Sequence, residues 1–397
     1  MTARSRWRTL LFGGAEPVPG NCLRLLQSGA EFFPALIAAI DSAHTEIHLE
    51  TYIFNADPSV EAVRDALIRA AGRGVGVRLL IDGVGSREVP ASWLEALNAA
   101  GVSVLHYRPL VNAWRSNPHT LRRLHRKIAV IDARIAFVGG MNLIDDYAPT
   151  RFDAPRLDFS VEVQGPLLAG IHKSVRRLWQ LVALTQLNAG ESRQPEMRPS
   201  WPTDGNMRAA FVVRDNFAHR RDIERVYLTG LALAKDEILI ANAYFLPGRR
   251  FRILLKKAAA RGVRVHLLVQ GHTDHPFFQA AARALYRDLL AAGVKIFEHH
   301  VSELHAKVGV IDGERATVGS SNIDPFSLLM AREANIVVDD AAFASDLRQR
   351  LQQAIDQSTV LDTADWLRRP WPHRVASWLA YGGVRVIVGL AGVGRWV

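Results

Sequence analysis

One pattern occurs twice in the chain and constrains the fold more than any other feature. Residues 125–132 and 305–312 each read H-x-K-x4-D. Each copy is followed by a Gly-Gly or Gly-Ser pair and then by an asparagine, Asn142 in the first and Asn322 in the second. All equivalent positions in the two copies are 180 residues apart. The chain is therefore expected to be an internal duplication with one motif in each half.

The residues after each motif lysine are apolar and largely β-branched, which is typical of a buried strand. Positions two apart on a strand face the same side, so His125 is expected to point with Lys127, and His305 with Lys307. A hairpin about the end of each motif would bring the asparagine back level with its histidine. Each half thus offers an imidazole, an ammonium and an amide to one space.

The aspartates that end the motifs, Asp132 and Asp312, need a separate interpretation. They belong to the motif's catalytic set, but each lies seven residues after its histidine, an odd separation that faces the other side of a strand. Asp312-Gly313 is also a strong hairpin signal. We therefore interpret both aspartates as structural residues that cap the turns.

This set of residues suits a phosphodiester. The lysines neutralise the non-bridging oxygens, and the amides of Asn142 and Asn322 donate to them, with Ser320 as a further phosphate-binding candidate. One histidine can attack phosphorus while the other protonates the leaving alcohol. Attack needs a neutral imidazole, usually oriented by a carboxylate. Asp158 and Glu333, in later strand-like segments, are the candidate orienting residues.

The duplicated motif resembles that of the phospholipase D superfamily. Within it, the chain is similar to bacterial cardiolipin synthases of the B subclass from about residue 22 to residue 360. The strings that carry this likeness are residues 80–86, 125–140, 214–216, 302–307, 319–325 and 333–335. The resemblance implies a phosphohistidine intermediate formed without metal, supports Asp158 and Glu333 as the carboxylates, and favours His125 as nucleophile with His305 as acid and then base.

The segments around the motifs predict an α/β fold of two similar halves, each a mixed sheet flanked by helices, with one active site at their junction. A basic segment (1–20) precedes the first half (21–190), and a Pro-rich linker (191–207) leads to the second (208–360). The tail (361–397) combines Trp and Arg with apolar residues, which is typical of an interfacial membrane anchor. A helix packed on the body is the alternative.

Composition limits the classes of partner and cofactor that the protein is expected to bind. Lys and Arg exceed Asp and Glu by 10, so we expect an anionic partner. A single cysteine excludes an internal disulfide. His299 and His300 are adjacent and would face opposite sides of a strand, so we expect neither a metal nor another cofactor. No uninterrupted apolar stretch is long enough to span a membrane.

The favoured function is cardiolipin synthesis: phosphatidyl transfer between two phosphatidylglycerols, with phosphatidylethanolamine as a further candidate substrate. The enzyme would sit peripherally on the cytoplasmic side of the bacterial cell membrane, at an anionic surface, without a nucleic-acid partner. The alternatives are a phospholipase D hydrolase and a nuclease or phosphodiesterase of the same superfamily, because the motif serves all three. A non-catalytic membrane-binding protein is disfavoured because both motifs are intact.

Overall fold

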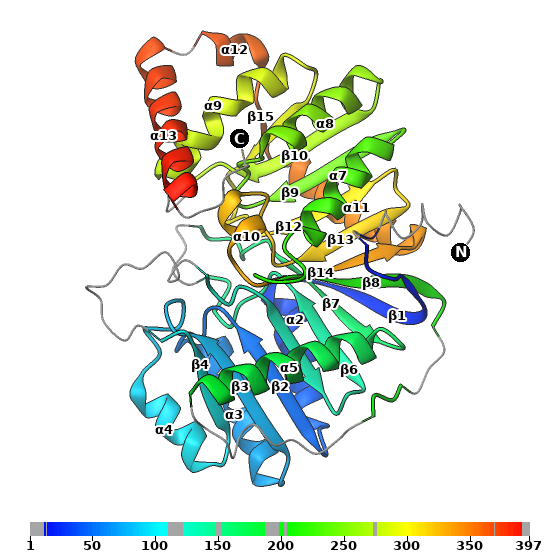
Figure 1. Cartoon of the computed structure of the whole chain (residues 1–397), viewed down its shortest axis with the longest axis vertical. Helices are drawn as coiled ribbons and strands as arrows, with labels where there is room; N and C mark the ends of the chain where they lie inside the picture. Colours follow the sequence, from blue (N-terminus) through cyan, green and yellow to red (C-terminus); the bar gives the residue numbers. More distant parts are fainter. Residues whose placement is uncertain are drawn as a thin grey trace.

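A computed structural model describes residues 12, 14–109, 122–147, 152–186, 198–201, 205–272, 276–368 and 370–390. Much of the predicted N-terminal segment and linker lies outside these residues, as does the end of the tail with Arg395 and Trp396. Figure 1 shows two α/β halves, one above the other.

Strands from both halves form one 15-stranded sheet. The first half contributes β1 (Val18–Gln27), β2 (Glu46–Thr51), β3 (Gly76–Asp82), β4 (Ser103–Tyr107), β5 (Lys127–Ile131), β6 (Ile135–Gly139) and β7 (Phe159–Gln164). The second half contributes β8 (Met207–Arg214), β9 (Glu237–Asn242), β10 (Arg264–Gln270), β11 (Lys295–His299), β12 (Lys307–Ile311), β13 (Arg315–Gly319), β14 (Glu333–Asp339) and β15 (Thr359–Val360).

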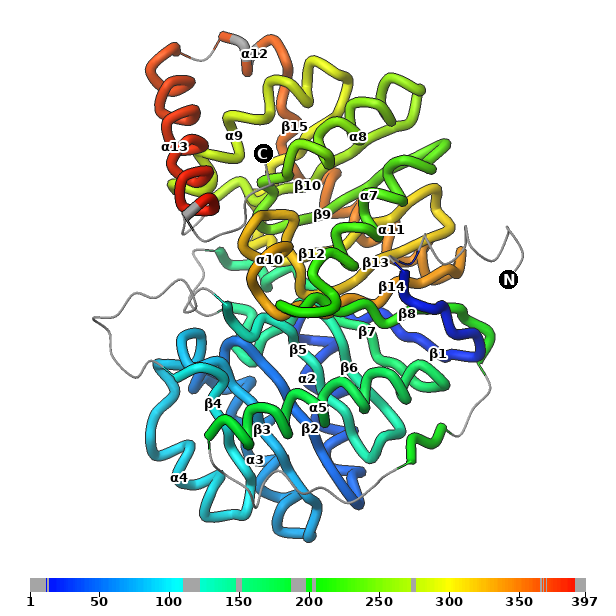
Figure 2. Tube along the Cα trace, viewed as in Figure 1, coloured from blue at the N-terminus to red at the C-terminus, as the bar shows by residue number. Residues whose placement is uncertain are grey.

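The strand order confirms the duplication. It runs β4-β3-β2-β5-β6-β7-β1 in the first half and β8-β14-β13-β12-β9-β10-β11-β15 in the second, so the halves mirror each other about the β1–β8 junction. Within each half three strands are parallel and the others antiparallel, which confirms the predicted mixed sheets. The antiparallel pairing of β1 with β8, visible in Figure 2, joins the two sheets into one, which the sequence did not predict.

Helices cover both faces of the sheet, as the alternation along β3 requires. Leu79 and Ile81 pack beneath one layer of helices, whereas Leu80 contacts Trp179 and its neighbours on the opposite face. The helices of the first half are α2 (Ser28–Asp41), α3 (Pro58–Gly72), α4 (Ala91–Ala99) and α5 (Leu168–Thr185). Those that follow are α7 (Asp222–Leu233), α8 (Arg249–Ala260), α9 (Pro276–Leu290), α10 (Pro325–Leu329), α11 (Ala341–Asp356), α12 (Thr363–Leu367) and α13 (Trp371–Leu390).

The hairpin between β5 and β6 determines how the residues of the first motif lie opposite one another. Lys127 lies opposite Gly139, one residue away from the register that we predicted. The reason is a three-residue turn in which Asp132 and Ala133 adopt left-handed backbone conformations, with φ of 52° and 50°. The Asp132 carboxylate accepts hydrogen bonds of 2.8–2.9 Å from the backbone N–H groups of residues 44–46, just before and at the start of β2.

Asp312 repeats this arrangement in the second half, where its carboxylate accepts from the backbone N–H groups of residues 235–237 at the start of β9. Both aspartates thus lie at the opposite ends of their strands from the motif histidines. This geometry fits their interpretation as structural residues and separates them from the chemistry.

The tail forms α13, which packs along α9 at one end of the second half (Figure 1). Ala380, Tyr381, Val384 and Val388 are buried and belong to the core of the second half. The outward face is also apolar: Trp371, Trp378 and Leu379 are 72%, 53% and 71% exposed. No helix among the described residues is long and apolar enough to cross a membrane.

Candidate active site

The two motif histidines are held at the junction of the halves by backbone hydrogen bonds that cross between them. The N–H of His125 donates to the carbonyl of Arg332 in the second half, at 2.9 Å. In return, the N–H of His305 donates to the carbonyl of Leu157 in the first half, also at 2.9 Å. Each histidine therefore lies beside the residue that precedes the carboxylate of the opposite half.

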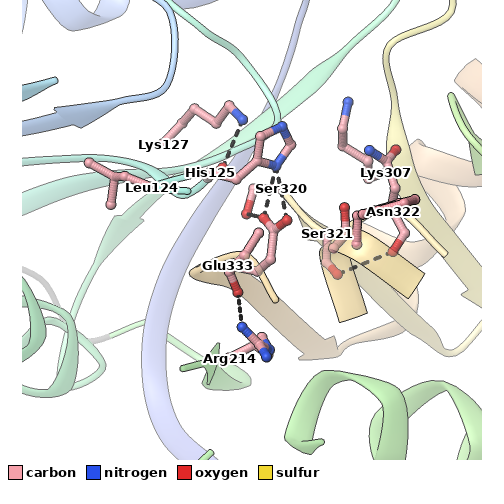
Figure 3. A network of polar contacts seen from close by, with 12 residues as sticks. Leu124, His125, Lys127, Arg214, Lys307, Ser320, Ser321, Asn322 and Glu333 are labelled. Atoms are coloured by element: carbon pink, nitrogen blue, oxygen red, sulfur yellow. Dashed lines mark hydrogen bonds and ion pairs between the residues drawn. The ribbon is translucent and has the colours of Figure 1, made fainter. Parts of the chain in front are cut away.

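This crossing decides which carboxylate serves which histidine. Nδ1 of His125 lies 3.0 and 3.1 Å from the two carboxylate oxygens of Glu333 (Figure 3). Nδ1 of His305 lies 2.5 Å from Oδ2 of Asp158. An ionised carboxylate accepts a hydrogen bond, so each Nδ1 carries the proton and each Nε2 keeps a free lone pair. The sequence named both carboxylates, but it did not say that each one orients the histidine of the other half.

Burial keeps both imidazoles neutral in the empty site. The pKa of His125 is lowered mainly by burial, against the opposing attraction of Glu333. The pKa of His305 is lowered further, by burial together with the nearby positive charges of Lys307 and Lys127. Burial also raises the pKa of Asp158, to about 6, which leaves this carboxylate mostly ionised at neutral pH. Neutral imidazoles are the form that can attack phosphorus.

The motif lysines lie beside their histidines, as the two-residue spacing predicted. Nζ of Lys127 donates to the backbone carbonyl of His125 at 2.7 Å (Figure 3). Nζ of Lys307 likewise donates to the backbone carbonyl of His305. Both side chains are buried, and this burial lowers the pKa of Lys127 to about 7 and that of Lys307 to about 8. A bound phosphodiester would favour their charged form, because an anion nearby raises the pKa of an ammonium.

The phosphate-binding candidates differ in where they lie. Asn142 and Asn322 both line the cavity that contains the two histidines. Ser320, in contrast, is fully buried and donates to Oε2 of Glu333 at 2.5 Å, while its oxygen accepts from the N–H of Ala334. In this arrangement the Ser320 hydroxyl contacts the carboxylate beside His125, and its role at the phosphate stays a prediction.

The first half has Gly140 at the position equivalent to Ser320. A Cβ at Gly140 would collide with the carboxylate of Asp158, so only glycine leaves room for that side chain. The Gly-Gly and Gly-Ser pairs of the two motifs thus accommodate their own half's carboxylate.

Both histidines line one cavity of about 430 Å³, a volume in the size range of small-molecule sites. Tyr52, Arg123 and Glu303 also line it and were not predicted. The ring of Tyr52 lies 5.1 Å from the imidazole of His125, measured between centroids. Tyr52 directly follows β2 (Glu46–Thr51), and the segments that follow strands often carry site residues.

Within the described part of the chain, one group of residues has the composition of a metal site: Glu46, His48 and His172. It lies at the start of β2, whereas the cavity lies beyond the end of that strand. Guanidinium groups of Arg78 and Arg176 lie 3.5 and 4.0 Å from Oε2 of Glu46, so its charge is already met by cations. The group is better described as a buried ion-pair cluster.

Comparison with known proteins agrees with this fold and site. A family model described as "Cardiolipin synthase, PLD-like domain" matches residues 36–154 and 227–355. Cardiolipin synthase B of Escherichia coli K12 is 38% identical over 384 residues, which cover 94% of this chain and 90% of the relative. Cardiolipin synthase B of Salmonella typhimurium LT2 is 39% identical over 388 residues, with the same coverage.

The fold is also shared with a solved structure at low sequence identity. The crystal structure of phosphatidylserine synthase from Haemophilus influenzae aligns with a TM-score of 0.74 at 13% identity, covering 98% of this chain and 99% of that one. Fold and site together define a phosphatidyltransferase of the phospholipase D superfamily. Within that superfamily, the chain belongs to the family of PLD-like cardiolipin synthases.

Proposed function

We propose that this enzyme makes cardiolipin by moving a phosphatidyl group from one phosphatidylglycerol to a hydroxyl of a second, with release of glycerol. The observation that supports the proposal most is the pair of imidazoles in one cavity, each oriented through Nδ1 by a buried carboxylate. Two such groups can act as nucleophile and as acid–base in the two halves of a displacement reaction.

In the first step, Nε2 of His125 attacks phosphorus, and the bond from phosphorus to the glycerol headgroup breaks. His305 gives the proton of its Nε2 to the departing oxygen, which leaves as neutral glycerol. Because burial lowers the pKa of His305, this proton has to be held with the help of the bound phosphodiester, whose negative charge raises that pKa. Lys127 and Lys307 stabilise the charge that builds on the non-bridging oxygens.

In the second step, neutral His305 takes the proton from a hydroxyl of the second phosphatidylglycerol. The resulting oxygen attacks phosphorus, the bond from phosphorus to Nε2 of His125 breaks, and cardiolipin leaves. The cycle returns both histidines to their starting protonation states. Water in place of the second lipid would give phosphatidate, so the hydrolase alternative differs only in which hydroxyl enters.

The test is an analysis of products. Vesicles of phosphatidylglycerol with labelled headgroup and labelled acyl chains are incubated with the protein, and the lipids are resolved. The proposal expects cardiolipin and free glycerol in equal amounts, and a second incubation with added phosphatidylethanolamine shows whether that lipid also reacts. Phosphatidate without cardiolipin at every lipid concentration would contradict the proposal in favour of the hydrolase.

The outward face of α13 favours a lipid substrate over the nuclease alternative. We infer that this face, defined by Trp371, Val375, Trp378, Leu379, Val386 and Ile387, contacts an anionic membrane. All six side chains are at least 41% exposed, and exposed Arg374 and Arg385 lie among them. Trp and Arg around an apolar surface suit the headgroup region, where each Arg can add about 1 kcal/mol of attraction. The site proposed is the cytoplasmic leaflet of the bacterial cell membrane.

A matched pair of point variants tests this contact without uncovering α9. Leu379→Glu places a charge on the proposed membrane face, and Leu233→Glu places the same charge on an exposed leucine, 43% accessible, at the end of α7. We expect sedimentation with anionic vesicles to show at least tenfold weaker binding for Leu379→Glu alone, because a buried leucine contributes about 1.5–3 kcal/mol. Equal binding by the two variants would remove the membrane assignment of α13.

A further inference from the structure

The cavity is not symmetric, although the fold is. Tyr52 and Ala243 occupy equivalent positions in the two halves. Tyr52 directly follows β2, Ala243 directly follows β9, and both residues line the cavity. On the first-half side, the Tyr52 ring lies near His125 and 5.5 Å from Nζ of Lys127. On the second-half side, the equivalent residue is Ala243, whose N–H donates to the carbonyl of Ala306, next to His305. The lining of the cavity therefore differs between the two halves at this position, where an aromatic ring faces a methyl group.

Much of the cavity lining on the second-half side is apolar, although Gln270, Gln279 and Asp324 also line it. Six mainly apolar side chains of this half contribute: Phe245, Val269, Phe278, Ala282, Tyr286 and Phe326. In the first half, the equivalent of Phe245 is Phe54, which is buried against the ring of Trp93 on α4, with centroids 5.7 Å apart. Phe245 is likewise buried, with its ring 6.2 Å from that of Phe251, but Phe245 lines the cavity and Phe54 is not among the lining residues.

Helix α9 forms one wall through a single face. Phe278, Ala282 and Tyr286 are four residues apart, a spacing that places them along one side of a helix. Phe278 is fixed against Phe326, with ring centroids 5.4 Å apart. Ala282 is the small residue between two aromatic ones, so the gap in this wall exists because position 282 carries only a methyl group.

The same helix also contacts α13. α13 packs along α9, with Gly383 of α13 close to the ring of Phe277, and Figure 1 shows the two helices side by side at the upper left. α9 thus lines the cavity through one face and also packs against the helix whose outward face is apolar.

We propose that this apolar space, which we call the acyl slot, receives an acyl chain of the phospholipid substrate. The proposal rests on the proposed function and adds a specificity determinant to it. The acyl slot is continuous with the imidazoles, so a chain held in it belongs to the same molecule as a phosphate or hydroxyl at the site. Apolar burial then makes turnover depend on chain length, by roughly tenfold for every two methylene groups that the slot buries.

The experiment changes the volume of the acyl slot and measures chain-length selectivity. Ala282→Leu narrows the slot, while Ala280→Leu adds the same carbons to a position on α9 that does not line the cavity. The readout is glycerol release from phosphatidylglycerols of matched headgroup and increasing acyl length, presented in one detergent at one molar ratio. We expect Ala282→Leu to lower the ratio of long-chain to short-chain kcat/KM by about tenfold, and Ala280→Leu to leave it as in the wild type.

A second variant changes the volume of the acyl slot in the opposite direction, so that a selectivity change can be distinguished from a loss of folding. Phe278→Ala widens the acyl slot, and we expect it to raise the same ratio for the longest chains. Unchanged ratios in Ala282→Leu and Phe278→Ala, in proteins whose thermal unfolding matches the wild type, would overturn the proposal. The proposed function is judged separately by the wild-type products, because glycerol release reports the first step whether the acceptor is lipid or water.

Discussion

Replacing Glu333 by glutamine tests the crossing of carboxylates between halves. The Glu333 side chain is fully buried, and both of its oxygens lie within 3.1 Å of Nδ1 of His125. Glutamine keeps the shape and an acceptor for Ser320, so what is lost is the negative charge. That charge is the largest influence that raises the pKa of both His125 and Lys127 against burial. Its removal therefore lowers both values, and that of Lys127 falls below about 7.

Two effects on the rate follow from this loss of charge. The imidazole is no longer held in the correct tautomer, and at pH 7 most of Lys127 is neutral and cannot neutralise the phosphate. We expect kcat/KM to fall by about 10²–10⁴ and the pH optimum to move to lower pH. Thermal unfolding should change little, because packing and the Ser320 hydrogen bond are preserved.

The pairing itself is read by nuclear magnetic resonance of ring-labelled histidines. We expect Glu333→Gln to shift the Nδ1–H resonance of His125 and leave that of His305 in place, whereas Asp158→Asn does the reverse. If Glu333→Gln perturbed His305 and spared His125, the carboxylates would serve histidines of their own half, and the reasoning would be refuted.

Three other outcomes are expected. His125→Ala and His305→Ala should each reduce lipid turnover to below a few per cent of wild type, since acid–base action alone contributes roughly 10²–10⁴, while circular dichroism remains unchanged; higher turnover in either variant contradicts a shared site. The kcat/KM profile should be bell-shaped: activity is lost at low pH as the nucleophile His125 protonates, below the ordinary 6.5, and at high pH as Lys127 and Lys307 deprotonate, at about 7–8; an alkaline limb above pH 10 would show that the lysines are not required as cations. Turnover should survive EDTA because the lysines supply positive charge at the phosphate; a loss reversed by one added divalent cation, with vesicle binding unchanged, would contradict this.

The sequence predicted the fold well because the information lay in periodicity and repetition. The alternation of helical and strand-like periodicity predicted the helices and strands on both sides of each motif. The second copy of the motif predicted that the two halves have similar folds. The β5–β6 register was wrong by one residue, because Asp132 and Ala133 adopt left-handed conformations that lengthen the turn and that neither residue type signals strongly. The β1–β8 pairing could not be predicted, because local residue patterns indicate where strands occur but not which strands pair with each other.

The site was predicted as a set of residues, and its connections were not. Motif spacing placed Lys127 beside His125 because strand geometry is local. The contact between His125 and Glu333 joins residues 208 positions apart, and it depends on the backbone bridge to Arg332 that only the assembled halves create. The contact of Ser320 with Glu333 was missed for the same reason, because its partner is 13 residues away on another strand.

The proposed mechanism requires a covalent intermediate at one histidine, in a site that is built by both halves. Phosphatidylglycerol labelled in its lipid phosphate is mixed with the enzyme, the reaction is quenched after milliseconds, and the label on the protein is mapped by digestion under alkaline conditions that preserve phosphohistidine. We predict acid-labile label on the peptide that contains His125, and none in the His125→Ala variant. Full turnover without any labelled peptide, or label on a peptide that contains neither motif histidine, would contradict the account.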